Sequence, residues 1–286
     1  MIGTPKKTFE ILKKHGFTFK KSLGQNFLID SNILNRIVDG AGINDKVGVI
    51  EIGPGIGSLT EAVAKKAKKV ISFEIDGRLL PILSETLADY SNVEIINNDI
   101  LKVDVDKIIS EKMSDCEKIM VVANLPYYIT TPILTHLIEN TQKIDGYVVM
   151  MQREVANRLN AKVGTKDYNS LTILLNYYTN VEYLFTVPKK VFVPAPNVES
   201  AVVKIMTKEE RDFEADSNFF KFVRSCFVQR RKTLLNNLIS SYGKDKKQDF
   251  QDSCLDSDID SKRRSETLTL MEFYNLYTNL KNNDLI

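Results

Sequence analysis

Cysteine is scarce in this chain, and the few cysteines are widely separated. Only three occur among 286 residues, at Cys116, Cys226 and Cys254. An odd number of distant cysteines does not suit the disulfide framework of a small secreted domain, and no zinc-ligand spacing is present. We therefore expect a protein of a reducing compartment that holds neither disulfides nor a metal ion.

Long apolar runs are absent as well. No stretch approaches the roughly 18 consecutive apolar residues that a membrane-spanning helix needs. Residues 1–21 are rich in lysine but contain no apolar segment before a small-residue cleavage site, so they do not form a secretory signal. The sequence predicts a soluble, cytoplasmic protein, and its 43% hydrophobic residues suffice for a full core.

Neither basic nor acidic residues are in large excess over the other. Lysine and arginine total 39 against 37 for aspartate and glutamate, and a net charge of +2 does not by itself indicate a nucleic-acid partner. Basic residues do cluster in the segment before Leu23 and at Arg230, Arg231 and Lys232, with Arg224 nearby. Taken alone, each cluster is explained more simply as a solvated surface than as an RNA contact.

Apolar runs alternate with amphipathic segments between Val47 and Met151. This alternation is typical of repeated βαβ units and of a parallel sheet. The expected strands are residues 47–52, 70–75, 93–97, 119–122 and 147–151. The expected helices between them are residues 59–67, 78–88 and 132–138. The sequence thus predicts a doubly wound α/β domain.

The second half of the chain has a different pattern. Residues 181–187 and 200–206 are β-rich and are joined by a proline-containing loop too short for a crossover helix, which predicts an antiparallel hairpin at the sheet edge. After Thr207 the composition becomes more polar, with helical runs at 219–228, 233–239 and 270–280. We expect two domains, residues 1–207 and 208–286. The polar residues 243–261 are expected to form a mobile loop.

A glycine-rich turn follows the first expected strand. Gly53, Gly55 and Gly57 precede Ser58, a plausible N-cap, in the order strand, glycine turn, helix. Glycines let a backbone approach a ligand closely, although a tight turn without a ligand uses the same residues. The spacing G-x-G-x-G differs from the G-x-G-x-x-G of the dinucleotide fingerprint.

Acidic residues lie at the ends of the next two expected strands. Glu74 lies about 20 residues beyond the glycines, where an acidic side chain accepts hydrogen bonds from ribose hydroxyls. Asp99 ends the third strand and could accept a hydrogen bond from an adenine amine. Each acid alone is explained as a solvated residue or a cap. Because the carboxyl ends of parallel strands meet at one edge, an adenosine lying there would meet the glycines and both acids. The pattern predicts an adenosyl cofactor.

The fourth expected strand is followed by Asn124, Leu125, Pro126, Tyr127 and Tyr128. An asparagine oxygen accepts a hydrogen bond from an exocyclic amine, a tyrosine ring stacks on a planar base, and proline stiffens the backbone between them. An ordinary turn would also use these residue types. The glycines and acids upstream favour a pocket for an aminated base.

These residues resemble those of the ribosomal RNA small-subunit adenine dimethyltransferases, which use S-adenosylmethionine. The similarity covers nearly the whole chain. It is carried by residues 23–28 (LGQNFL), 51–57 (EIGPGIG), 124–127 (NLPY), 152–159 (QREVANRL), 164–168 (GTKDY) and 192–202 (FVPAPNVESAV). Asn169 and Ser170 depart from the family pattern, which often has glycine and a basic residue there.

The resemblance implies a Rossmann-like class I methyltransferase domain with a mostly parallel seven-stranded sheet and a small C-terminal helical domain that contacts RNA. It also implies N6,N6-dimethylation of two adjacent adenosines near the 3′ end of small-subunit 16S ribosomal RNA and a role in subunit biogenesis. Separately from the resemblance, we expect a monomer. The implied cofactor contacts are Asn26, Leu28, Gly53, Gly55, Glu74, Asp99 and Asn124.

Around the base, the residue types and the resemblance suggest specific roles. We expect the Asn124 side-chain oxygen and the Leu125 carbonyl to accept the protons of the adenine amino group, which localises the nitrogen lone pair. Tyr127 is expected to stack on one face of the extruded adenine and Phe192 on the other. Pro126 would hold the turn in place.

Three other interpretations remain open. A dimethyltransferase of large-subunit 23S RNA that confers antibiotic resistance would share the glycine turn and a similar Asn-x-Pro-Tyr. A ribosome-assembly or nucleic-acid-binding factor could keep the fold without the chemistry. A nicotinamide dehydrogenase would need a different glycine spacing. Residues 164–168 and 192–202 favour the small-subunit enzyme.

Overall fold

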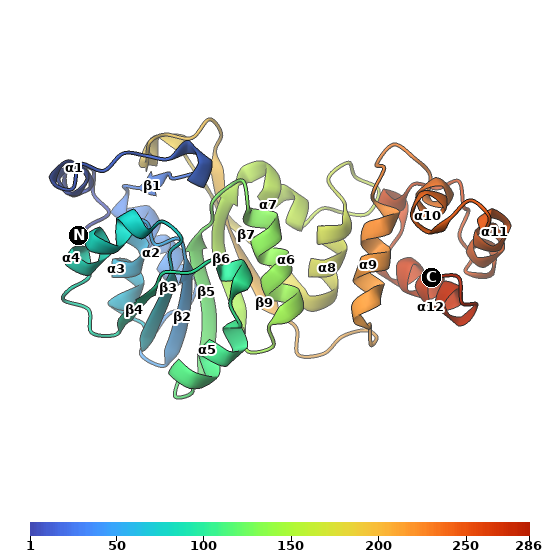
Figure 1. Cartoon of the computed structure of the whole chain (residues 1–286), viewed down its shortest axis with the longest axis horizontal. Helices are drawn as coiled ribbons and strands as arrows, with labels where there is room; N and C mark the ends of the chain where they lie inside the picture. Colours follow the sequence, from blue (N-terminus) through green and yellow to red (C-terminus); the bar gives the residue numbers. More distant parts are fainter. The chain divides into compact units, whose positions relative to one another are not determined.

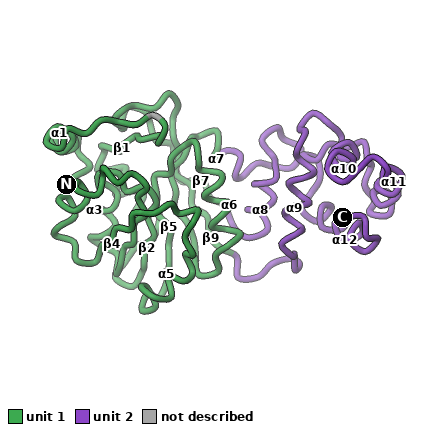
Figure 2. Tube along the Cα trace, viewed as in Figure 1, with its two compact units in different colours: residues 1–156, 181–207 green, residues 157–180, 208–286 purple. Residues whose placement is uncertain are grey.

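The structure of the chain, a computed structural model, describes residues 1–286 except for the side chain of Lys21. It forms two compact units (Figure 2). Unit 1 contains Met1–Ala156 and Val181–Thr207, and unit 2 contains Asn157–Asn180 and Lys208–Ile286.

A seven-stranded sheet forms the centre of unit 1 (Figure 1). The strand order is β4-β3-β2-β5-β6-β9-β7. The first five strands in this order pair in parallel, and β9 pairs antiparallel with β6. Its strands are β2 (Val47–Ile52), β3 (Lys69–Phe73), β4 (Val93–Ile96), β5 (Lys118–Asn124), β6 (Gly146–Gln152), β7 (Thr179–Val187) and β9 (Ser200–Thr207). The predicted fold class, a mostly parallel α/β sheet, is confirmed.

The apolar runs of β2, β5 and β6 form strands that are buried on both faces. In β2, Val49 packs into the core that includes Leu34 and Val63, whereas Ile50 points to the opposite face, and both β2 residues are fully buried. A parallel sheet covered on both sides needs such continuous apolar strands. Polar side chains that bind a ligand are therefore expected where the strands end.

Helices connect the strands of unit 1. They are α1 (Pro5–Lys14), α2 (Ser31–Gly40), α3 (Ser58–Ala64), α4 (Leu80–Thr86), α5 (Val105–Lys112), α6 (Thr130–Asn140) and the start of α7 (Arg153–Leu159). Ser58 is the first residue of α3 and not its N-cap, contrary to the prediction. Gly57 takes the cap position with a φ of 91°, a left-handed conformation that glycine adopts without strain.

A second, two-stranded sheet lies in unit 1, where β1 (Phe27–Leu28) pairs antiparallel with β8 (Phe192–Val193). The two β-rich segments predicted to close the main sheet are β7 and β9, which are neighbours at its edge. Among the described residues, no helix is long and apolar enough to cross a membrane.

Unit 2 is helical, as the sequence predicts for residues 208–286, but it also includes residues 157–180. Its helices are α8 (Ser170–Tyr178), α9 (Ser217–Cys226), α10 (Leu234–Tyr242), α11 (Lys247–Asp256) and α12 (Leu270–Asn282). Tyr177 on α8 packs against the rings of Phe213 and Phe220 with centroid distances of 5.1 and 5.3 Å. This aromatic contact explains why the division does not follow the expected boundary at residue 207.

Two local features of unit 2 were not predicted. Residues 243–261 contain α11, not only a loop, because Phe250 and Cys254 stand four residues apart and give an otherwise polar helix a buried stripe. Asn169, which departs from the family pattern, caps α8 by accepting the Leu171 N–H at 2.9 Å.

Candidate active site

An open pocket lies at the carboxyl ends of β2 to β5 in unit 1, with about 1090 Å³ of space that includes solvent at its mouth. The lining contains all but one of the residues proposed from the sequence: Asn26, Leu28, Gly53, Gly55, Glu74, Asp99, Asn124, Leu125, Pro126 and Tyr127. The exception is Phe192.

The glycine turn shapes the floor of this pocket. Gly53 and Gly55 have φ values of 69° and 61°, which are left-handed conformations that favour glycine. A Cβ on Gly53 would have no protein atom within 4 Å, because that position faces the pocket. A Cβ on Gly55 would instead lie 2.9 Å from the Phe27 ring. Both positions thus let other groups approach the backbone closely.

Glu74 follows β3 and is 5% exposed. One carboxylate oxygen accepts the Asp76 N–H at 2.8 Å, and the other accepts the Gly55 N–H at 3.4 Å. Burial raises the pKa of Glu74 to about 7, although these backbone donors oppose the rise. The bonds fix a carboxylate at the pocket wall, where it can accept hydrogen bonds from a pair of ligand hydroxyls.

Glu51 lines the same pocket and was not singled out from the sequence as a site residue. Its Oε2 accepts the hydroxyls of Thr60 and Ser72, both at 2.7 Å. Burial raises the pKa of Glu51 to about 7, against the effect of the two hydroxyls. One acid inside an otherwise apolar strand was the signal that could have identified it.

We expect Glu51→Gln to remove part of the pH dependence of stability. The pKa of Glu51 is raised from 4.5 to about 7 in the folded chain, so the native state binds more protons between these values and stability falls as the pH rises. Glutamine keeps an acceptor for Thr60 and Ser72 but does not ionise. Between pH 5.5 and pH 8, the free energy of unfolding measured in urea should fall by about 2 kcal/mol less in the variant than in wild type. Equal losses would contradict the raised pKa.

Asp99 lies at the other side of the pocket, after β4. Its Oδ1 accepts the Leu101 N–H at 3.1 Å and caps the short 3₁₀ helix Ile100–Lys102. This bond holds the side chain in place and occupies only one of the two oxygens. The second oxygen can accept a hydrogen bond from a ligand amine.

Asn124 ends β5, and its side chain is oriented by a backbone carbonyl. The Asn124 Nδ2 donates to the Asn26 oxygen at 3.0 Å. Because a carbonyl can only accept, this contact sets the amide so that the opposite atom, Oδ1, is the acceptor. Neither Oδ1 nor the neighbouring Leu125 carbonyl receives a hydrogen bond from the described residues. The pocket therefore offers two acceptors next to each other.

Tyr127 contributes an aromatic ring to the pocket and holds its hydroxyl inside the protein. Its Oη lies 2.5 Å from the hydroxyl oxygen of Ser200 on β9, which is fully buried. Burial raises the pKa of the Tyr127 phenol, although Ser200 opposes the rise. The ring is thereby fixed at its far end and can serve as a stacking surface.

The structure does not bring Phe192 to the pocket, contrary to the prediction. Phe192 is 3% exposed and belongs to the apolar core that includes Leu28, its partner in the β1–β8 pair. Burying this ring removes a large apolar surface from water, which explains why it lies in the core. Only Tyr127 of the two expected stacking rings lines the pocket.

Two close relatives of the chain have the same protein name. The ribosomal RNA small subunit methyltransferase A of Staphylococcus carnosus is 55% identical over 284 residues, which are 98% of this chain and 96% of the relative. The protein of that name from Anoxybacillus flavithermus is 56% identical over 279 residues, or 96% of this chain and 95% of the relative.

Solved structures agree with the fold. The crystal structure of a dimethyladenosine transferase from Plasmodium falciparum matches with a TM-score of 0.73 and 28% identity, over 90% of this chain and 98% of that chain. The 23S rRNA methyltransferase ErmE matches with a TM-score of 0.63 and 25% identity, over 90% of this chain and 100% of that chain.

A family model described as ribosomal RNA adenine dimethylase matches residues 16–276, a range that contains the whole pocket lining. The match confirms the resemblance seen in the sequence, and with it an enzyme that uses S-adenosylmethionine to methylate adenines of ribosomal RNA. The chain belongs to the ribosomal RNA adenine dimethylase family.

Proposed function

We propose that this chain transfers methyl groups to the N6 amino groups of two adjacent adenosines near the 3′ end of small-subunit 16S ribosomal RNA, dimethylating each. The observation that carries the proposal is the Asn124 amide, which the Asn26 carbonyl orients so that an acceptor stands beside the Leu125 carbonyl. Relatives named ribosomal RNA small subunit methyltransferase A, at 55% and 56% identity, support the choice of subunit.

The pocket fits S-adenosylmethionine by the chemistry of its lining. We assign the ribose hydroxyls to the Glu74 carboxylate and the adenine amine of the cofactor to Asp99, with the glycine turn between them. Asn26 and Leu28 close the pocket from the N-terminal segment. When bound, the cofactor supplies a methyl group activated by a positively charged sulfur.

The residues after β5 prepare the acceptor nitrogen. The amino nitrogen of adenine is a weak nucleophile because its lone pair is delocalised into the ring. Asn124 Oδ1 and the Leu125 carbonyl accept hydrogen bonds from its two N–H groups, hold the nitrogen in position and localise the lone pair. Tyr127 stacks on one face of the base, and Pro126 stiffens the turn between them.

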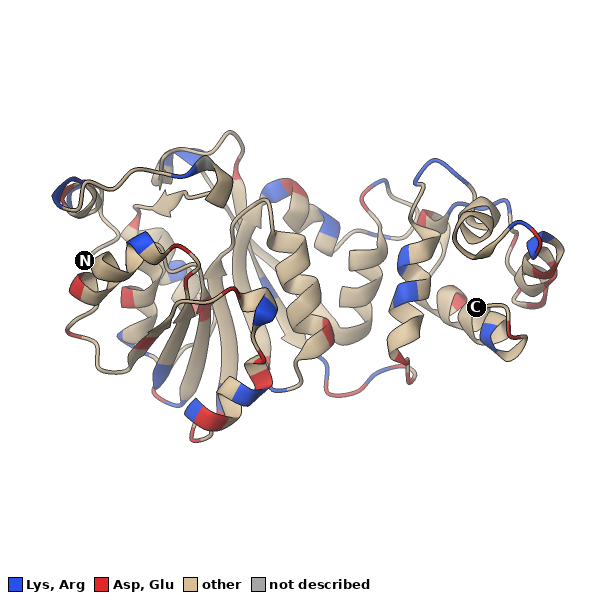
Figure 3. Cartoon of the chain, viewed as in Figure 1, with Lys and Arg blue, Asp and Glu red and all other residues tan. Residues whose placement is uncertain are grey.

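The basic clusters supply RNA contacts outside the pocket. Figure 3 shows lysines along α1 and a basic segment between α9 and α10. The exposed residues are Lys6, Lys7, Lys13 and Lys14 on α1 and Arg230, Arg231 and Lys232 in the second cluster. Cations of this kind bind phosphates and make affinity depend on salt. We propose that residues 208–286 contact RNA and that the enzyme works as a monomer in the cytoplasm.

Gly53→Ala should abolish binding of S-adenosylhomocysteine. The added methyl group would occupy the space where the ligand approaches the backbone. Gly42→Ala is the matched control, since Gly42 has a φ of 63°, also has no atom within 4 Å of its Cβ position, and is absent from the pocket lining. Both changes should destabilise the fold by about 1–2 kcal/mol through backbone strain. Calorimetry that finds equal binding by both variants would contradict this role of Gly53.

The function can be tested in cells of the source organism. Mass spectrometry of nucleosides from small-subunit RNA should find N6,N6-dimethyladenosine when the gene is present and none when it is deleted. Restoring the gene should restore the modification, whereas the Asn124→Ala variant should not. Persistence of the modification after deletion, or its loss from large-subunit RNA instead, would overturn the proposal.

A further inference from the structure

The N-terminal segment 17–28, which we call the wall, borders the pocket through its last six residues. Residues 23–28 belong to the lining, and Phe27 packs against Gly55 of the glycine turn. Because this wall comes from a segment outside the main sheet, its position depends on contacts to the strand ends. Asn124 holds Asn26 by one such contact, and a second group of contacts converges on one carboxylate, Asp76.

Asp76 is 6% exposed and makes hydrogen bonds with both oxygens. Arg78 donates to Oδ1 through Nε at 2.9 Å and to Oδ2 through Nη2 at 2.6 Å. Gln25 of the wall donates its Nε2 to Oδ2 at 2.7 Å. Asp76 is therefore committed to protein groups, and its own N–H donates to Glu74 at 2.8 Å.

Gln25 and Arg78 extend these bonds along the wall. The Gln25 Oε1 accepts the Lys20 N–H at 2.9 Å. The side chain of Gln25 therefore links the Lys20 backbone to the Asp76 carboxylate. Arg78 donates Nη1 to the Thr18 oxygen at 3.0 Å, and its guanidinium lies 5.0 Å from the centre of the Phe17 ring. We call the set Gln25, Asp76 and Arg78 the latch.

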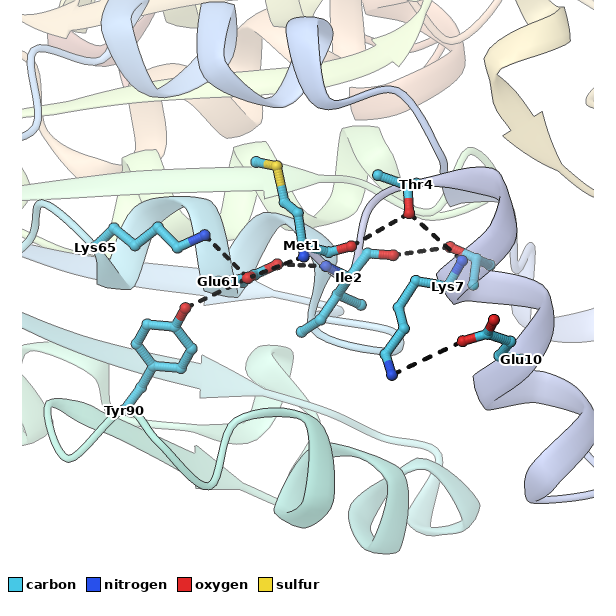
Figure 4. A network of polar contacts seen from close by, with 9 residues as sticks. Met1, Ile2, Thr4, Lys7, Glu10, Glu61, Lys65 and Tyr90 are labelled. Atoms are coloured by element: carbon cyan, nitrogen blue, oxygen red, sulfur yellow. Dashed lines mark hydrogen bonds and ion pairs between the residues drawn. The ribbon is translucent and has the colours of Figure 1, made fainter.

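The segment is anchored on either side of the latch. Figure 4 shows Glu61 on α3, whose carboxylate accepts the Ile2 N–H at 2.5 Å, Lys65 at 3.0 Å and the Tyr90 hydroxyl at 3.4 Å. Further along, the β1–β8 pair holds residues 27–28. The latch thus holds residues 17–25, which lie between these two anchors.

We propose that Gln25, Asp76 and Arg78 are positioning residues for the methyl donor. Their polar side-chain atoms bond to protein groups, and these bonds hold the wall and the Glu74 carboxylate in one arrangement before the donor binds. A pocket formed in advance loses less conformational freedom on binding and so binds more tightly. This inference rests on the proposed placement of the cofactor at Glu74.

Arg78→Ala and Gln25→Ala test the latch, with Arg78→Lys as the conservative variant. Calorimetry with S-adenosylhomocysteine should show Kd raised about tenfold by Arg78→Ala and less by Arg78→Lys. The kcat at saturating donor and the KM for RNA should stay within about twofold of wild type, because neither residue meets the base. Hydrogen exchange of residues 17–28 should be faster in free Arg78→Ala and return to the wild-type rate with saturating ligand.

Glu85→Gln is the matched control. Glu85 binds Lys14 at 2.5 Å and His15 at 3.1 Å, so it ties the same end of the chain to α4 outside the pocket lining. The Kd of the Glu85→Gln variant for S-adenosylhomocysteine should equal that of wild type. Wild-type Kd values in the Arg78 and Gln25 variants, unchanged exchange of residues 17–28, or an equal loss in Glu85→Gln would each overturn the latch.

Glu74→Ala distinguishes a failure of the latch from a failure of the proposed cofactor placement. If Glu74→Ala weakens binding while the latch variants bind normally, the latch is wrong and the cofactor placement stands. If Glu74→Ala binds like wild type, the placement of the cofactor is wrong, and the latch falls with it.

Discussion

Asn124→Ala should lower kcat by about 10²- to 10³-fold, the usual cost of removing one group that stabilises a transition state electrostatically. The alanine variant keeps the Leu125 carbonyl but loses the acceptor beside it, so the amino nitrogen is neither held nor activated. It also loses the single bond to Asn26, and the Kd for S-adenosylhomocysteine should therefore change by only about threefold. Single-turnover methylation of ribosomal RNA and calorimetry measure the two effects.

Asn98→Ala provides the control for this experiment. Asn98 also lines the pocket, but it follows β4, three strands away from β5 in the sheet order β4-β3-β2-β5. At about 4.8 Å between neighbouring strands, that places it far from the acceptor base. Its removal should leave kcat within about twofold of wild type. Wild-type turnover by Asn124→Ala would show that this amide does not act on the base.

Glu74→Ala should raise the Kd for S-adenosylhomocysteine by about 10- to 100-fold, which corresponds to losing hydrogen bonds from ligand hydroxyls to a charged acceptor. The change also frees the N–H groups of Asp76 and Gly55, which Glu74 now holds at 2.8 and 3.4 Å. Calorimetry gives the Kd, and initial rates at saturating donor should recover part of the lost activity.

Glu117→Ala is a suitable control for Glu74→Ala. Glu117 is an exposed glutamate that pairs with Lys46 at 2.8 Å and does not line the pocket. Its removal should not alter the Kd. An equal Kd for wild type and Glu74→Ala would remove this carboxylate from the cofactor site.

Much of the pocket could be predicted because parallel strands end at one edge. Gly53, Glu74, Asp99 and Asn124 are spread over about 70 residues of sequence, yet each directly follows an apolar run. The topology that the runs imply places all four side by side, and they all line one pocket. Position relative to a strand end was therefore sufficient to group these residues without knowing any distance.

The remaining features depend on packing that sequence patterns do not display. Phe192 belongs to a motif of the family, but burial with Leu28 determines where its ring lies. The latch was missed because Gln25 and Asp76 are 51 residues apart, and no pattern in the sequence indicates that their side chains meet. Glu51 was visible in the sequence as an acid inside an apolar strand, but its hydroxyl partners on α3 and β3 were not.

Methylation of isolated ribosomal subunits by the purified protein tests most directly whether it acts on small-subunit adenosines. Small and large subunits from cells without the gene would be incubated with methyl-labelled S-adenosylmethionine, and the digested RNA analysed for N6,N6-dimethyladenosine. The expected result is label on two adjacent adenosines of small-subunit RNA, absent with Asn124→Ala. Label confined to large-subunit RNA, or none on either subunit, would contradict it.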